Sequence, residues 1–123
     1  MNTAPIFQIA SADAELSLLL DSDGIFRLFM FGMAPQNVER PYAVWQLISG
    51  SPQNYISGRP DTEAHTLQID VYAKTASEAR TVLGSLERAL EVHCHVRRYN
   101  GESRDTETKD YRASMDVDWI TYR

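Results

Sequence analysis

The sequence lacks the features that define several common protein classes. Cys94 is the only cysteine among 123 residues, which excludes an internal disulfide and fits a cytosolic setting. No run approaches the roughly 20 apolar residues needed to cross a bilayer. The N-terminus has neither the basic start nor the continuous apolar middle of a signal peptide. We therefore expect no membrane association and an intracellular protein.

Positive charge is also scarce. The chain has 12 lysines and arginines against 17 acidic residues, a net charge of −5. A protein whose main task is to grip phosphate backbones needs a basic face, so this class is not expected. The composition is globular, with 43% hydrophobic and 24% charged residues, and its length predicts one domain over residues 1–123.

Motifs that carry catalysis or cofactors are missing as well. The six glycines are scattered and form no phosphate loop, and there is no Gly-x-Ser-x-Gly or Cys-x-x-Cys. Asp70, Asp116 and Asp118 are carboxylates at outward strand positions, but no companion base or nucleophile accompanies them. We expect no enzyme activity and no cofactor.

Hydrophobic periodicity predicts an α+β fold. Residues 3–20 form one or two helical pieces, the second capped by Ser11, and a Thr75-x-x-Glu78 capping box begins a long helix that ends near residue 91. Strands are predicted over 25–31 (a weak one), 42–49, 64–73, 92–99 and 111–122. The prediction is a mainly antiparallel sheet of about four strands with the long helix on one face. Residues 100–110 are predicted to be a mobile charged loop, and Gly84 to reflect close packing.

Apolar residues also occur where a single layer would not bury them. Strand 42–49 is apolar on both faces, so we expect a cover on each side, one of them supplied by another chain. Tyr42 and Trp45 lie on this strand. Residues 50–63 are predicted to be an arm that carries Tyr55, Ile56 and Arg59, and apolar groups on such a connection indicate contact with a partner.

Two clusters near the C-terminal half leave alternatives open. His93 and His95 would share one face of a strand and could begin a metal site, with Asp116, Asp118 or His65 as a third ligand. The favoured alternative is two solvent-facing histidines with Cys94 packed inward. Arg97 and Arg98, followed by Tyr99, are expected to pair with acids of the 102–110 loop or of a neighbouring subunit rather than with nucleic acid.

The pattern of the whole chain resembles a known family. Pro41–Gln46 (PYAVWQ), Ser49–Pro52 (SGSP), Leu67–Ala73 (LQIDVYA) and Asp118–Arg123 (DWITYR), in this order and spacing, are similar to the tail completion, or tail terminator, proteins of long-tailed bacteriophages and prophages. The resemblance implies a virion structural protein, assembled in the host bacterial cytoplasm. It would form a homo-oligomeric ring, usually a hexamer, at the head-proximal end of the tail.

The ring implied by the resemblance would end polymerisation of the tail tube protein, offer a docking surface to the head–tail connector protein and let DNA pass through its lumen without specific binding. Head-to-tail contacts that close into a ring suit the apolar strand and the arm. The residues expected at subunit or partner interfaces are Tyr42, Trp45, Tyr55, Ile56 and Arg59. Those expected at the lumen or a docking face are Asp70, Glu102, Asp105, Asp116 and Asp118. The alternatives are another phage neck or minor tail protein, a metal- or ligand-binding module using His93 and His95, and an enzyme subunit whose site a partner completes.

Overall fold

The computed structural model of the chain describes residues 5–52 and 62–122. Helices and short strands come first, and a sheet of long strands interrupted by one long helix follows. The elements in order are α1 (Ile6–Ser11), α2 (Ala14–Leu20), β1 (Asp21–Ser22), β2 (Ile25–Phe26), β3 (Leu28–Met30), β4 (Tyr42–Pro52), β5 (Thr62–Ala73), α4 (Ala76–Leu90), β6 (Cys94–Arg104) and β7 (Tyr111–Tyr122). The predicted α+β class is confirmed.

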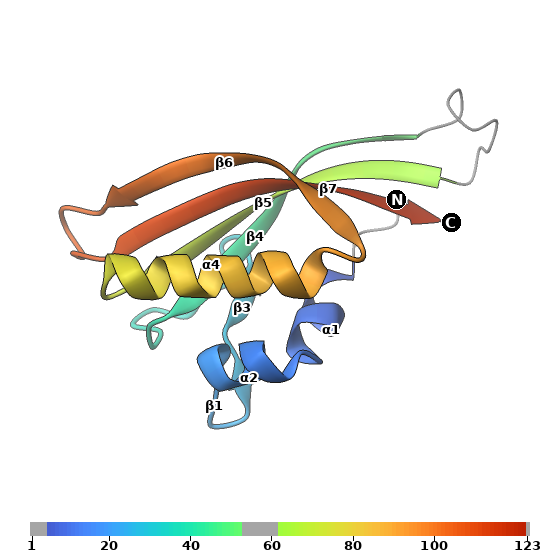
Figure 1. The fold of residues 1–123 in the computed structure, drawn as a ribbon. Coiled ribbons are helices and arrows are strands. Elements are labelled where there is room, and N and C mark those ends of the chain that lie inside the picture. Colours follow the sequence, from blue (N-terminus) through green and yellow to red (C-terminus); the bar gives the residue numbers. More distant parts are fainter. Residues whose placement is uncertain (1–4, 53–61, 123) are drawn as a thin grey trace.

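The main sheet has five strands in the order β3-β4-β5-β7-β6. β3 runs parallel to β4, and the remaining neighbours are antiparallel, so the mainly antiparallel prediction is correct. The strand beyond the predicted four is β3, which comes from the segment predicted as a weak strand. β1 and β2 form a separate antiparallel hairpin. Figure 1 shows the main sheet as a curved layer, with the β1–β2 hairpin hanging below α2.

Alternation along the strands decides which face of the sheet is buried. In β5, Leu67, Ile69, Val71 and Ala73 are at most 1% exposed, as the period of two predicts. Three of their partners on β7, Val117, Met115 and Ala113, are at most 1% exposed, and Tyr111 opposite Ala73 is partly buried. These residues form the inner face of the sheet, and α4 lies across it (Figure 1).

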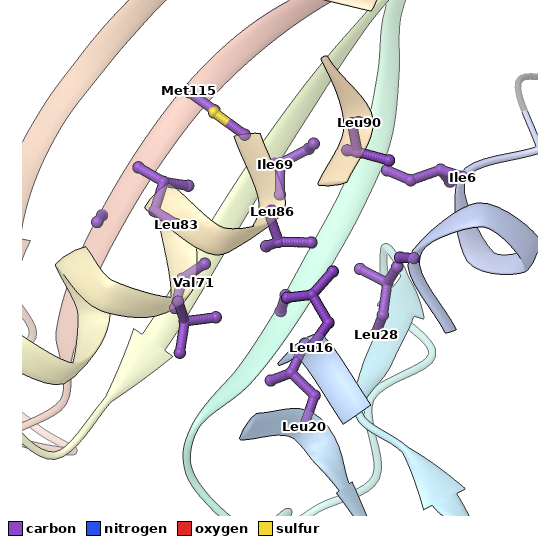
Figure 2. Close-up of a cluster of buried hydrophobic side chains, with 14 of the residues drawn as sticks. Ile6, Leu16, Leu20, Leu28, Ile69, Val71, Leu83, Leu86, Leu90 and Met115 are labelled. Atoms are coloured by element: carbon purple, nitrogen blue, oxygen red, sulfur yellow. The ribbon is translucent and has the colours of Figure 1, made fainter. Parts of the chain in front are cut away.

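The long helix begins where the capping box predicts. Thr75 Oγ1 accepts a hydrogen bond from the Glu78 backbone N–H at 3.1 Å, which satisfies one of the N–H groups that a helix start leaves unpaired. Leu86 and Leu90 point from the helix toward Ile69 and Ile6 in the core (Figure 2). Gly84, by contrast, is exposed, and a Cβ added there would meet nothing within 4 Å. The hypothesis of close packing at Gly84 is therefore wrong.

The two N-terminal helices complete the core beside α4. Leu16 and Leu20 of α2 are fully buried and approach Leu28 in Figure 2. The cap of α2 differs from the prediction, because Asp13 rather than Ser11 accepts the Leu16 backbone N–H, at 3.0 Å. Asp13 lies directly before the first helical residue, where its carboxylate reaches the unpaired N–H groups.

The aromatic segment 25–31 is extended as far as Met30, largely as predicted, but it divides into β2 and β3 at Arg27. Arg27 is only 6% exposed. Its Nε donates to the Pro41 carbonyl oxygen at 2.8 Å, and its Nη2 donates to the Leu19 carbonyl oxygen at 3.1 Å. Buried charge is retained only where hydrogen bonds compensate for lost hydration. Arg27 therefore ties α2, β3 and the start of β4 together.

The expected loop over residues 100–110 is shorter in the structure. β6 continues to Arg104, paired with β7 through two register shifts, and only 105–110 connects the strands. Asp105 closes that connection by accepting the Glu107 backbone N–H at 2.8 Å. The loop was predicted because the C-terminal half of β6 has no apolar residues at alternate positions. Its backbone ladder to β7 holds it instead.

Candidate interaction surfaces

The outer face of the sheet, opposite α4, has no helix over it in the described part of the chain (Figure 1). Polar residues of β5 and β7 alternate with the apolar core residues and occupy this face, where Thr66, Asp70, Ser114 and Asp116 are at most 9% exposed. The exposed side chains of this face include those of Arg97 and Arg98 on the edge strand β6, so a partner would meet β6 first.

Asp70, Asp116 and Asp118 lie on this outer face, as predicted, but they are not its exposed groups. Asp116 is 1% exposed and Asp70 is 9% exposed. The prediction of an outward acidic row is wrong in this respect. The reason is that arginines of β6 and β7 lie over the carboxylates, which sequence alternation alone does not reveal.

Each of these carboxylates has an arginine partner. Arg98 Nε donates to Asp116 at 2.9 Å, and Asn100 Nδ2 donates to the other oxygen of Asp116 at 2.7 Å. Arg112 Nη2 donates to Asp70 at 3.0 Å. The pairs neutralise the buried charge, as a carboxylate withdrawn from water requires.

Two side chains donate hydrogen bonds to Asp118, and a third lies nearby. Arg97 Nε donates to its two oxygens at 3.0 and 3.1 Å, Thr66 Oγ1 donates at 2.8 Å, and His95 Nε2 lies 3.6 Å away. Partial burial alone would raise the pKa of Asp118, but the hydrogen bonds from Thr66 and Arg97 outweigh it and lower the pKa below 3.8. Of the two kinds of partner expected for Arg97 and Arg98, the 102–110 loop is thus wrong for the described residues, since the acids they contact lie on β7; a neighbouring subunit stays a prediction.

The remaining predicted acids lie at the opposite end of β6. Glu102 accepts two hydrogen bonds from Arg80 of α4, at 2.6 and 2.8 Å, and both side chains are exposed. Asp105 is exposed in the β6–β7 connection. Between α4 and β6, an open groove of about 370 Å³ is lined by Leu83, Gly84, Tyr99 and other residues.

Tyr42 and Trp45, both expected at an interface, lie on opposite faces of β4. Tyr42 is half-buried on the outer face and stacks on Tyr72, with ring centroids 5.1 Å apart. Trp45 packs partly buried against the core. Part of the cover predicted for this strand therefore comes from the chain itself. Tyr55, Ile56 and Arg59 lie outside the described residues.

The histidine pair does not form a metal site. His93 stacks on Trp119, with centroids 5.9 Å apart, whereas His95 approaches Asp118 on the other face of β7. Within residues 5–52 and 62–122, no group of three His, Cys, Asp or Glu side chains is placed to hold a metal ion. Cys94 is half-buried, and this burial, with the charge of Asp118, raises its pKa to about 11. A thiol with such a pKa is a poor nucleophile at neutral pH.

One surface was missed by the sequence analysis. The β1–β2 hairpin exposes two carboxylates, Asp21 and Asp23, beside Ile25, whose exposed fraction is 56%. Asp23 and Gly24 both have positive φ, 53° and 78°, and form the tight turn. The Asp-Ser-Asp-Gly run predicts the turn. Only the tertiary structure shows that the turn projects from the domain (Figure 1).

No helix in the described residues is long and apolar enough to span a membrane. The fold and its surfaces thus define a small α+β domain with an uncovered sheet face. A comparison with protein families matches residues 4–122 to the family described as tail completion protein gp17. The chain belongs to this family of structural phage tail proteins, and the predicted resemblance is confirmed.

A comparison with solved structures agrees on the fold. A chain of the structure titled "Virion of native gene transfer agent (GTA) particle" matches with a TM-score of 0.66 and 12% sequence identity. The match covers 96% of this chain and 92% of that chain. At this identity the likeness shows the shared fold. A comparison with curated proteins found no match.

Proposed function

We propose that the protein is the tail terminator of a long-tailed phage or prophage. Copies of the chain form a ring, in our proposal a hexamer, on the head-proximal end of the tail. The ring ends polymerisation of the tail tube protein and gives the head–tail connector protein its docking surface. The observation that carries this proposal is the family match over residues 4–122.

The fold is compatible with assembly by contact alone. β4, β5 and β7 pair as far as Pro52, Thr62 and Tyr122, which takes them past the C-terminal end of α4 (Figure 1). In this proposal, the projecting part of the sheet takes part in contacts between copies of the chain. Tyr42 and Trp45, together with Tyr55, Ile56 and Arg59, are our candidates for subunit and partner contacts.

In this proposal, DNA passes through the lumen of the ring without specific binding. The net charge of −5 disfavours a stable hold on phosphates. Arginine side chains lie over Asp70, Asp116 and Asp118, so these carboxylates would not form the exposed surface of a lumen wall. Glu102 and Asp105, which are exposed, are our acidic candidates for the lumen or a docking face.

The likeness to a chain of a gene transfer agent virion supports a place in the particle among other structural proteins. We therefore place the protein in the virion, at the head-proximal end of the tail, after assembly in the host bacterial cytoplasm. The proposal assigns it no enzymatic step, consistent with a family of structural tail proteins.

Deletion and complementation of the gene test this function. A phage that lacks the protein should make tails of abnormal length, or heads and tails that fail to join. Electron microscopy counts both defects, and the wild-type gene supplied in trans should restore normal tails and joined particles. Normal virions from the deletion strain would refute the proposal. Tails of normal length that join heads normally but lack another component would instead indicate a minor tail protein.

A further inference from the structure

Two arginines on β6 are fixed in place and still available to a partner. Arg97 and Arg98 reach Asp118 and Asp116 through Nε, and their side chains are 58% and 67% exposed. Among the described residues, each arginine uses its Nε to bind its carboxylate. The terminal nitrogens of each guanidinium group therefore remain for another acceptor. An arginine that is already ordered loses little entropy when it binds, and its planar fork matches a carboxylate.

The same chain carries a matching acidic element. The β1–β2 hairpin holds the exposed Asp21 and Asp23 on a tight turn, next to the exposed apolar side chain of Ile25. Figure 1 shows that this hairpin projects below α2, whereas the outer face of the sheet points away from α4. The two surfaces are thus on opposite sides of the domain. One copy can engage both at once, each with a different neighbour.

We propose that the β1–β2 hairpin of one copy docks on the outer sheet face of the next copy, where the carboxylates of Asp21 and Asp23 accept hydrogen bonds from Arg97 and Arg98. The inference rests on the ring of the proposed function and names the surfaces that join its subunits. A contact between two different surfaces is heterologous and closes into a ring when the rotation allows. Opposite charges fix the register of such a contact and oppose wrong pairings.

Charge favours a second copy over nucleic acid as the occupant. Arg97 and Arg98 each have an acidic partner, Asp118 and Asp116, so the cluster is neutral in sum. A polyanion gains affinity from the release of many counterions, which a neutral cluster does not provide. A carboxylate at hydrogen-bond distance gains from the exposed nitrogens without needing net charge.

Cross-linking within assembled particles tests the contact. Cysteines are introduced by Ile25→Cys on the hairpin and His95→Cys beside the arginines, in a Cys94→Ser background, and a short bismaleimide is added. Both positions are exposed, and the substitutions keep the four charged residues of the proposed contact. The double variant should give a ladder at multiples of 14.0 kDa. Each single variant should give monomer only, as should Ile25→Cys paired with Glu107→Cys.

Particles that contain the double variant but yield no ladder would overturn this inference and leave the proposed function standing. Absence of the wild-type chain from particles would overturn the proposed function itself. The two failures are therefore distinguishable by immunoblot of the same particles before cross-linking.

Charge variants give a second, independent measurement. Asp21→Lys should reduce incorporation into particles at least tenfold, while Glu107→Lys, with the same change of charge on the β6–β7 connection, should not. Arg97→Gln should reduce incorporation more than Arg80→Gln, which removes an arginine from α4. Equal incorporation within either pair of variants would contradict the proposal. This test remains decisive when the cysteine double variant is not incorporated into particles. An Arg97→Gln variant that incorporates normally but retains DNA fragments less well would point to a phosphate partner and overturn it.

Discussion

Arg98, on the edge strand β6, donates a 2.9 Å hydrogen bond from Nε to Asp116, a carboxylate that is 1% exposed on β7. The arginine is largely in solvent and the acid is not. On the outer face of the sheet, the negative carboxylate of this pair is therefore buried and the positive guanidinium group is exposed. This arrangement reverses what the aspartates alone would predict for that face.

Removal of Arg98 should destabilise the fold. Arg98→Ala leaves the buried Asp116 carboxylate with Asn100 as its side-chain donor among the described residues. We therefore expect the free energy of unfolding to fall by about 1–3 kcal/mol. The full penalty for breaking a buried ion pair is not expected, because the arginine itself is exposed. Urea unfolding measures the difference. Arg80→Ala, which breaks the exposed pair with Glu102, is the matched control and should cost less. Equal losses would contradict the role assigned to Asp116.

Replacement of Gly84 should stabilise the isolated domain. An added Cβ meets nothing within 4 Å, so Gly84→Ala gains helix propensity without a clash, about 0.5–1 kcal/mol. Thermal unfolding of the purified chain measures the gain. The same substitution at Gly101, where φ is +93°, should instead destabilise. A loss of stability in Gly84→Ala would show that the helix surface there is not open.

The thiol of Cys94 should react slowly while the protein is folded. Its pKa is raised to about 11, chiefly by burial and further by the charge of Asp118. The thiolate fraction at pH 7.5 is then roughly a hundredfold or more below that of an ordinary cysteine. Maleimide labelling followed by mass spectrometry should be slow in buffer and fast in denaturant. Rapid labelling of the folded chain would contradict the burial of this residue.

Acid should weaken the fold partly through Asp118. Its pKa is lowered in the folded state, so its contribution is present above the unfolded value of 3.8 and is lost as pH falls through the lower folded value. Unfolding free energy measured from pH 6 to pH 3 should therefore fall below about pH 4 in the wild type. Asp118→Asn should start less stable and lose less over this window. A parallel decline in both proteins would exclude a contribution from Asp118, and Glu107→Gln serves as the control for a change of charge.

Local patterns were sufficient for much of the fold. The alternation of Leu67, Ile69 and Val71 predicts a strand with one buried face, and that face is buried, although Asp70 on the opposite face is buried as well. Thr75 with Glu78 predicts where α4 begins, and this prediction is confirmed. These features depend on neighbours within a few residues, which the sequence states directly. The order and spacing of such elements along the whole chain also sufficed for the resemblance to the tail completion family, which the family match confirms.

What only the tertiary structure decided depends on pairing between distant segments. The register of β6 against β7 sets Arg98 beside Asp116 and brings Arg97 within reach of Asp118, which buries carboxylates that alternation alone would expose. The separation of His93 from His95 and the projection of the β1–β2 hairpin depend on packing in the same way. No local signal specifies such contacts, because they form between residues brought together only when the strands pair and the helices cover one face of the sheet.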